Sequence, residues 1–114
     1  MVFHAQYLAF MERARTELLN DAGIDLARMA DERGVQIMVS TLSVKYHRAA
    51  RLNELVSVSA EVVKIGRASV LFRQRVERED VLLVEAEITL AIVDRERMKP
   101  ARMPSELEQA LNHA

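Results

Sequence analysis

The sequence contains no cysteine and no tryptophan, and it has only two prolines and three glycines among its 114 residues. Because cysteine is absent, the chain forms no disulfide, has no thiolate nucleophile and offers no Cys-based zinc site. The three histidines, His4, His47 and His113, are too widely spaced to indicate a local metal-binding motif. We therefore expect no metal site, and the lack of disulfides is compatible with the reducing cytoplasm.

No charge of one sign dominates the sequence. It has 16 Lys and Arg against 17 Asp and Glu and 4% aromatic residues, so neither disorder nor a polyanion-binding surface is indicated. Nucleic acid is therefore not an expected partner. No apolar run approaches the roughly 18 residues that a membrane span needs, and the start lacks the basic and then apolar pattern of a signal peptide. We expect a single domain over residues 1–114, located in the cytoplasm.

Two helices are predicted in the first third of the chain. From Tyr7 onward apolar residues recur every three or four positions with charged residues between them, which predicts an amphipathic helix from Ala5 to Asn20. Gly23 can adopt the positive φ that often ends a helix, and Asp25 can cap a second helix that stops at Gly34. The apolar face of the first helix comprises Phe10, Met11, Ala14 and Leu18.

After Gly34 the apolar period changes from about 3.6 residues to 2, which predicts β-structure as far as Lys99. Three strands, over 55–65, 70–76 and 84–92, each show one apolar face. The turns between them are short, so they should form an antiparallel meander. Their apolar faces should pack against the first helix, through the residues Val58, Phe72, Ile88 and Leu90.

In the strand that precedes this meander, over 35–46, the apolar residues lie at odd positions as far as Val39 and at even positions from Leu42 onward. The change indicates either a bulge near Ser40 and Thr41 or a strand buried on both faces. After the sheet, a short helix from Ser105 to Leu111 is predicted, with Ser105 as its cap. The result is an α+β fold in which one sheet face wraps a helix, with open edges unless a further strand or a partner covers them.

The segment HAQYLAFMERARTELL, which begins at His4, resembles the signature of hotdog-fold acyl-CoA thioesterases of the 4-hydroxybenzoyl-CoA thioesterase class. The resemblance is closest to the Tol/Pal-associated branch, and it continues through residues 44–58, 66–76, 83–94 and 99–104. The signature positions matched are Val2, Phe3, His4, Tyr7, Leu8, Phe10, Glu12, Arg13, Ala14 and Arg15.

This resemblance implies a hotdog fold, with an antiparallel sheet wrapped around the helix from Ala5 to Asn20, in a homodimer or homotetramer. It also implies hydrolysis of acyl-CoA or a related thioester, such as one carried by acyl carrier protein. The acyl chain would run beside the helix, with coenzyme A at the subunit interface. No cofactor is implied beyond the coenzyme A that forms part of the substrate.

One feature of the signature has no counterpart in this sequence. The family has an aspartate seven residues before the histidine, near the loop that leads from a first strand into the helix, whereas only three residues precede His4. We interpret this as an internal initiator or a truncated chain, and we expect poor hydrolysis by the polypeptide of residues 1–114. The alternative is a non-catalytic module that binds acyl-CoA or acyl carrier protein, or an oligomeric scaffold.

The resemblance assigns His4 and Tyr7 to the catalytic site. The backbone N–H of His4, at a helix start, would stabilise the oxyanion that develops during thioester hydrolysis. Tyr7 could line the acyl pocket, but it also belongs to the apolar stripe and could simply pack in the core. Glu12 and Glu17 are the carboxylates of this helix, and for Glu12 we favour an ion pair with a neighbouring arginine over catalysis.

A second set of candidates lies around a predicted turn. The resemblance places coenzyme A contacts at Lys64, Arg67 and Ser69, where two cations suit its phosphates and a hydroxyl suits its pantetheine arm. The competing interpretation is an ordinary charged hairpin turn. His47 and His113 belong to no motif, and we assign them no function.

Overall fold

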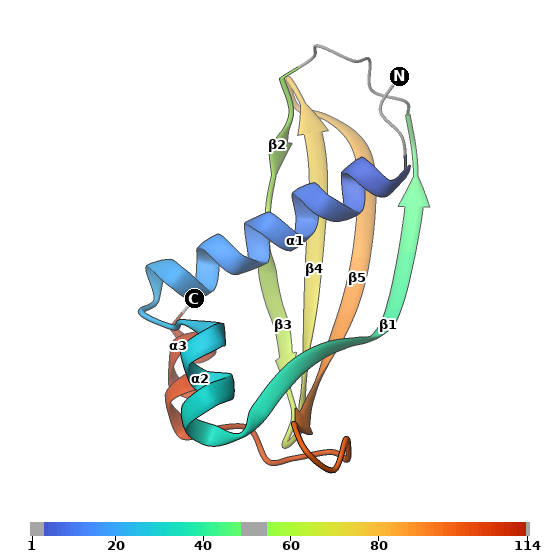
Figure 1. The fold of residues 1–114 in the computed structure, drawn as a ribbon. Helices are drawn as coiled ribbons and strands as arrows, with labels where there is room; N and C mark the ends of the chain where they lie inside the picture. The colour runs from blue at the N-terminus through green and yellow to red at the C-terminus, as the bar shows by residue number, and fades with distance from the viewer. Residues whose placement is uncertain (1–3, 49–54, 114) are drawn as a thin grey trace.

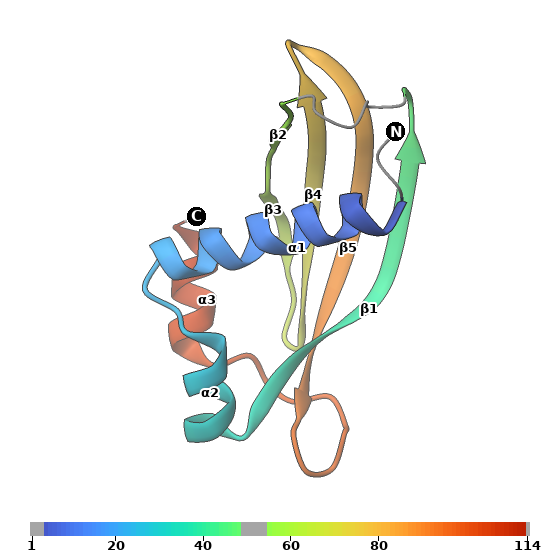
Figure 2. The same cartoon turned by 45° about the horizontal axis from the view of Figure 1, so that its top comes forward.

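The computed structural model describes residues 4–48 and 55–113. A long helix crosses one face of a curved antiparallel sheet, and two short helices lie together beyond its C-terminal end (Figures 1 and 2). None of the helices in the described ranges is long and apolar enough to cross a membrane. In chain order the elements are α1 (His4–Asp21), α2 (Leu26–Arg33), β1 (Val35–Tyr46), β2 (Ser57–Val58), β3 (Glu61–Ile65), β4 (Ser69–Arg78), β5 (Val81–Asp94) and α3 (Ser105–Asn112).

The predicted helices are present, with one difference in capping. The Asp25 carboxylate accepts a hydrogen bond from the Arg28 N–H at 3.1 Å to begin α2, and Gly34 ends it with φ of 67°. The Ser105 cap is wrong, because α3 already includes Ser105 and the capping position belongs to Pro104, which has no side-chain hydrogen-bond acceptor.

The sheet has the strand order β1-β5-β4-β2, and β3 also pairs with β4. This confirms the predicted meander, and its second turn is tight because Glu79 and Asp80 both adopt positive φ, at 48° and 67°. The bulge in β1 is confirmed as well, since the register against β5 shifts between Val39 and Thr41. As a result Val39 and Leu42, which differ in parity, lie opposite the core-facing residues Leu90 and Ile88.

The continuous strand predicted over 55–65 is wrong, because the structure divides it into β2 and β3. The break falls at Ser59, whose hydroxyl accepts the Arg75 N–H at 3.2 Å and whose carbonyl accepts the Gln74 amide at 3.2 Å. Side chains thus replace part of the regular backbone ladder at this point. The alternating apolar residues on both sides of Ser59 gave no sign of it.

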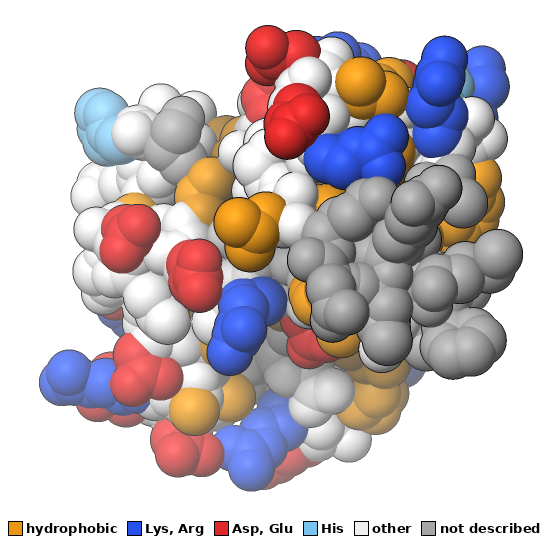
Figure 3. Space-filling view, turned by 90° about the horizontal axis from the view of Figure 1, so that it is seen from above, with side chains coloured by type: hydrophobic (Ala, Val, Ile, Leu, Met, Phe, Trp, Pro, Cys, Tyr) orange, Lys and Arg blue, Asp and Glu red, His pale blue; other side chains and the backbone are white. Residues whose placement is uncertain are grey.

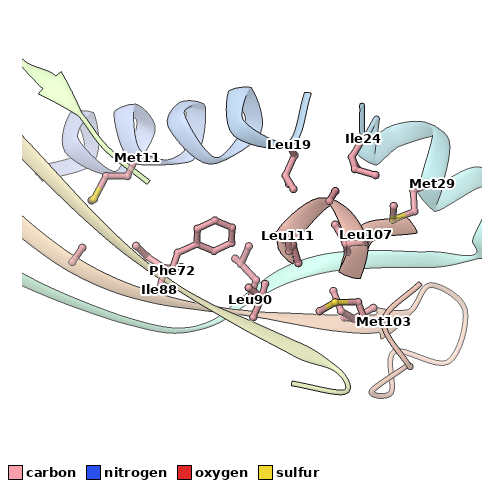
Figure 4. Packing of buried hydrophobic residues seen from close by; sticks show 14 of the residues in the cluster. Met11, Leu19, Ile24, Met29, Phe72, Ile88, Leu90, Met103, Leu107 and Leu111 are labelled. Carbon is pink, nitrogen blue, oxygen red and sulfur yellow. The ribbon is translucent and has the colours of Figure 1, made fainter. Parts of the chain in front are cut away.

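The core lies between α1 and the concave face of the sheet. Met11 projects from α1 toward Phe72 and Ile88, while α2 and α3 close the far end of the core with Met29, Leu107 and other apolar side chains (Figure 4). This confirms the predicted packing against Phe72, Ile88 and Leu90, which are at most 6% exposed, whereas Val58 is only partly buried against the same core. Phe10 was placed on the buried face wrongly, since it is 36% exposed. Successive helical residues point about 100° apart, so burying Met11 turns Phe10 outward.

Candidate functional site

A groove of about 320 Å³ lies between α1 and the part of the sheet formed by β1 and β5. We call it the α1 groove. Apolar side chains make up most of its wall, and two charged side chains from α1 complete it. Such a lining suits an extended apolar group that carries few polar atoms. The residues that line it are Leu8, Met11, Glu12, Arg15, Val39, Leu42 and Ile88.

The start of α1 provides a place for developing negative charge. The helix begins at His4, as predicted within one residue, and the first N–H groups of any α-helix have no partner within the helix. The first turn contains no acidic residue, so no carboxylate of its own offsets the positive end of the helix dipole. The backbone N–H of His4 thus lies at the start of a helix, and its role as an oxyanion donor stays a prediction. The His4 imidazole lies outside the described side chains.

Tyr7 lies one turn further along α1 and is only 3% exposed. Its ring centroid is 5.8 Å from that of Tyr46, near the end of β1, and the two rings are tilted by 56°. Such a contact between aromatic rings holds the beginning of α1 against the edge strand. This arrangement is what core packing by Tyr7 would produce, and its assignment to the catalytic site remains a prediction.

The predicted coenzyme A residues lie at the opposite end of the sheet from the start of α1 (Figures 1 and 2). Lys64 and Arg67 are exposed, and Ser69 is half-buried at the start of β4. Arg67 lines a cavity of about 480 Å³ together with Arg102, which the sequence analysis did not single out. A hydrogen bond of 2.8 Å from the Met103 N–H to the Arg67 carbonyl joins the two segments.

Two arginines on one cavity form a suitable site for a phosphate group, although neither Lys64 nor Ser69 belongs to its lining. In the sequence Arg102 lies between Pro100 and Pro104, but no local pattern connects Arg102 to Arg67. Within one chain the structure does not bring His4 together with the predicted coenzyme A residues.

A buried polar residue that sequence reasoning missed connects α1 to the sheet. Gln74 is fully buried, and its amide donates to the carbonyls of Met11, at 2.9 Å, and Ser59, at 3.2 Å. Its side-chain oxygen accepts a hydrogen bond of 2.7 Å from the Arg15 guanidinium. The available signal was a single polar residue at a core-facing position between Phe72 and Val76.

The charged side chains Glu12, Arg15 and Glu17 on α1 differ in their surroundings. Burial lowers the pKa of Arg15, and the nearby charge of Glu12 opposes this shift. Across the described residues Glu12 takes part in no ion pair, so the predicted pairing is wrong, and only this longer-range attraction to Arg15 is present. Glu17 does not reach the α1 groove and instead lines a separate hollow with His113.

The edge strand β1 leaves several large apolar side chains in contact with solvent. The exposed fractions are 40% for Met38, 53% for Val39, 43% for Leu42 and 47% for Tyr46. In the space-filling view, apolar side chains are visible at the right-hand margin, and acidic and basic side chains are scattered over the rest of the visible face (Figure 3). Val39 and Leu42 also line the α1 groove, so this edge and the groove form one continuous surface.

An antiparallel sheet that wraps one long helix is the architecture of hotdog-fold thioesterases, and known proteins that resemble this chain belong to that class. Residues 1–85 match the model of the thioesterase superfamily, and the chain belongs to that superfamily. It is 38% identical over 113 residues to the acyl-CoA thioesterase YbgC of Haemophilus influenzae, with 99% of this chain and 83% of that protein covered.

Solved structures confirm the hotdog fold. The hypothetical protein TT1821 from Thermus thermophilus superposes with a TM-score of 0.87 at 35% identity, covering 98% of this chain and 84% of that one. Slr0204 from Synechocystis, a 1,4-dihydroxy-2-naphthoyl-CoA thioesterase, superposes with a TM-score of 0.89 over 97% of this chain and 82% of that one. Its identity is only 14%, so the second likeness bears on the fold alone.

Proposed function

We propose that this protein hydrolyses acyl thioesters of coenzyme A and belongs to the Tol/Pal-associated branch of its superfamily. The observation that carries the proposal is the α1 groove, a mostly apolar groove beside a helix whose first turn has no acidic residue. The 38% identity to a protein named acyl-CoA thioesterase supports the same substrate class. A thioester on acyl carrier protein presents the same reacting group and is the natural variant to test.

In this mechanism the acyl chain occupies the α1 groove and the thioester carbonyl lies near the start of α1. A carboxylate attacks the carbonyl carbon or activates a water molecule that does so. The amides at the start of α1, including that of His4, stabilise the oxyanion, and the carbonyl then re-forms as the coenzyme A thiolate leaves. Attack by water gives the free acid directly, whereas attack by the carboxylate leaves a mixed anhydride, which a water molecule then hydrolyses to the free acid and the original carboxylate. The reaction transfers no electrons and needs no metal or redox cofactor.

The source of the carboxylate determines how fast the polypeptide of residues 1–114 works. In the signature that the sequence resembles, the carboxylate belongs to an aspartate seven residues before the histidine, and no residue of 1–114 occupies that position. Of the acidic side chains in the described structure, Glu12 is the one that lines the α1 groove. We therefore propose slow hydrolysis by 1–114 alone and faster hydrolysis once an aspartate is supplied ahead of His4.

We also propose that two copies associate along β1, either as a dimer or within a tetramer, in the cytoplasm. β1 is the last strand of the sheet order, and an apolar edge strand invites pairing with another strand. A second copy would also supply what one chain lacks, because the start of α1 and the turn containing Arg67 lie at opposite ends of the sheet. A composite site at the interface places coenzyme A from one subunit against α1 of the other.

Thiol release from hexanoyl-CoA, palmitoyl-CoA and the matching acyl-pantetheines tests the proposal. The enzymes compared are 1–114, the same chain extended by a segment with the aspartate, and the extended chain with that aspartate changed to asparagine. We expect the extended chain to be faster by roughly 10²- to 10⁴-fold, the usual contribution of a positioned acid or base. Binding without hydrolysis by all three would refute the enzymatic proposal and favour an acyl-CoA-binding module.

The coenzyme A contacts are tested separately with Arg67→Met. This change should raise KM for acyl-CoA and leave KM for the acyl-pantetheine unchanged, because only the former carries nucleotide phosphates. Arg28→Met is the matched control, since Arg28 lies on α2 and pairs with Glu32 at 2.9 Å. Equal KM shifts for both thioesters, or for both variants, would contradict the assignment.

A further inference from the structure

The hydrogen bonds of Gln74 define the orientation of its amide. Both amide N–H groups donate to carbonyls, those of Met11 and Ser59, and the side-chain oxygen accepts from Arg15. Exchanging the nitrogen and the oxygen would put two carbonyls against an oxygen and set the amide donors against the guanidinium. Gln74 therefore presents an acceptor to Arg15 and holds it in one position.

A structural role for Gln74 does not by itself explain why an arginine lies beside it at position 15. The bond from Gln74 to the Met11 carbonyl already ties α1 to β4, and it needs no arginine. Placing a guanidinium in a partly buried position is unfavourable, as the lowered pKa of Arg15 shows. The bond to Gln74 uses one of five N–H donors, and Arg15 also lines the α1 groove.

Glu12 lines the same groove and, in the described structure, forms no ion pair with Arg15. The groove wall thus contains a hydrogen-bond donor, the Arg15 guanidinium, and an acceptor, the Glu12 carboxylate, that do not pair with each other. A hydroxyl group complements this combination because it can accept from the guanidinium and donate to the carboxylate. A carboxylate in the same place would be repelled by Glu12, and a methyl group would bond to neither residue.

We propose that Arg15, held by Gln74, is a specificity-determining residue that selects acyl groups bearing a hydroxyl within the α1 groove. Arg15 contacts the acyl group, and Gln74 is a positioning residue that acts through Arg15. The inference rests on the proposed function in one respect, which is that the groove receives the acyl part of a thioester. It goes beyond that function by naming the chemistry that the groove recognises.

The test uses three coenzyme A thioesters of equal chain length: hexanoyl, 6-hydroxyhexanoyl and adipoyl. A hydrogen bond to a charged group should lower KM for the hydroxyl compound roughly tenfold relative to hexanoyl-CoA, with little change in kcat. Adipoyl-CoA should gain less, because of Glu12. Arg15→Met should abolish the preference, so that the KM values for hexanoyl-CoA and the hydroxyl compound measured in this variant become about equal. Arg13→Met is the matched control, since Arg13 is exposed on α1 and does not line the groove.

The positioning role of Gln74 is tested with Gln74→Met in both backgrounds. In the native chain this change should weaken the hydroxyl preference, whereas in Arg15→Met it should change the preference no further. A merely structural role for Gln74 would instead raise KM or lower kcat for hexanoyl-CoA and the hydroxyl compound alike, and it would leave the hydroxyl preference of the native chain unchanged. If Gln74→Met does not fold, Arg15→Met still decides the main proposal.

A binding measurement separates failure of this inference from failure of the proposed function. The non-hydrolysable thioethers S-hexyl-CoA and S-(6-hydroxyhexyl)-CoA are compared by calorimetry, so turnover is not required. Tenfold tighter binding of the hydroxyl compound, lost in Arg15→Met, would support the inference even in a chain that hydrolyses nothing. Equal binding and equal KM values for the hydroxyl and plain compounds would overturn the inference while leaving thioester hydrolysis intact.

Discussion

Replacing Gln74 by methionine removes three hydrogen bonds and nearly preserves the volume of the side chain. Two of these bonds join neutral groups, to the carbonyls of Met11 and Ser59, and the third accepts from the charged Arg15. Neutral bonds contribute about 1 kcal/mol net, and bonds to charged groups about 1.5 to 3 kcal/mol. Added together they set an upper limit of about 5 kcal/mol.

Two features of the structure reduce this limit. The Met11 carbonyl remains an acceptor within α1, where the helix pairs it with the Arg15 N–H, so it is not orphaned. Ser59 is exposed, which lets water reach its carbonyl. The main loss is therefore the partner of the half-buried guanidinium, and we expect Gln74→Met to destabilise the fold by about 2 kcal/mol.

Urea unfolding followed by circular dichroism measures this change, at one fixed protein concentration because association of copies would add to the apparent stability. Gln109→Met is the matched control, because Gln109 is exposed on α3 and should change stability by no more than about 0.5 kcal/mol. If both variants unfold at the same urea concentration, the Gln74 network contributes nothing measurable and the reasoning fails.

Three further predictions concern the core, the edge strand and a turn. Phe72→Ala should lower the free energy of unfolding by about 3 to 5 kcal/mol, because Phe72 is fully buried, whereas Phe10→Ala should cost far less; similar losses would refute the assigned helix face. Sedimentation at micromolar concentration should show an oligomer that Leu42→Lys dissociates, and a stable native monomer would exclude pairing along β1. The Arg97 N–H holds the pKa of Asp94 below its usual range, so this carboxylate stabilises the fold above the ordinary carboxyl pKa and less as pH falls through the lowered value. The destabilisation by Asp94→Asn, measured as the difference in unfolding free energy from the native chain, should therefore shrink in acid. A difference that stays constant down to low pH would contradict this.

The elements that the sequence predicted well are those determined by neighbouring residues. The end of α2 depends on Gly34, whose positive φ is a local property, and the hairpin at Glu79 and Asp80 follows from a short polar gap between two apolar strands. The bulge near Ser40 was predictable because a parity change leaves a trace in the order of residues. Each of these signals lies within a few positions of the feature that it specifies.

What the sequence did not reveal depends on contacts between distant segments. Glutamine is usually found at the surface, and Gln74 is favourable in the core only because the carbonyls of Met11 and Ser59 lie close enough to accept its hydrogen bonds. The break between β2 and β3 follows from the same contacts. Arg102 likewise reaches the cavity beside Arg67 because the C-terminal segment folds back along β5, where Pro100 pairs with Val93.

The sequence offered candidate site residues, but it did not show where in the fold they lie. The signature located the start of α1, while the position of the Arg67 turn at the other end of the sheet follows from the topology. A sequence pattern states which groups a reaction needs, and it does not state whether one chain brings them together. In the described structure of one chain the two halves of the predicted site do not meet, and their meeting across two chains is part of the proposed function.

The edge strand connects the proposed association of two chains with the chemistry of the groove. Val39 and Leu42 are exposed on β1, which makes them unfavourable in an isolated chain, and the same two side chains line the α1 groove. A partner that pairs along β1 would cover the open side of this wall and exclude water from the acyl chain. Excluding water strengthens the interaction of an oxyanion with the amides at the start of α1, because the local dielectric falls. Association and hydrolysis would thus depend on one surface.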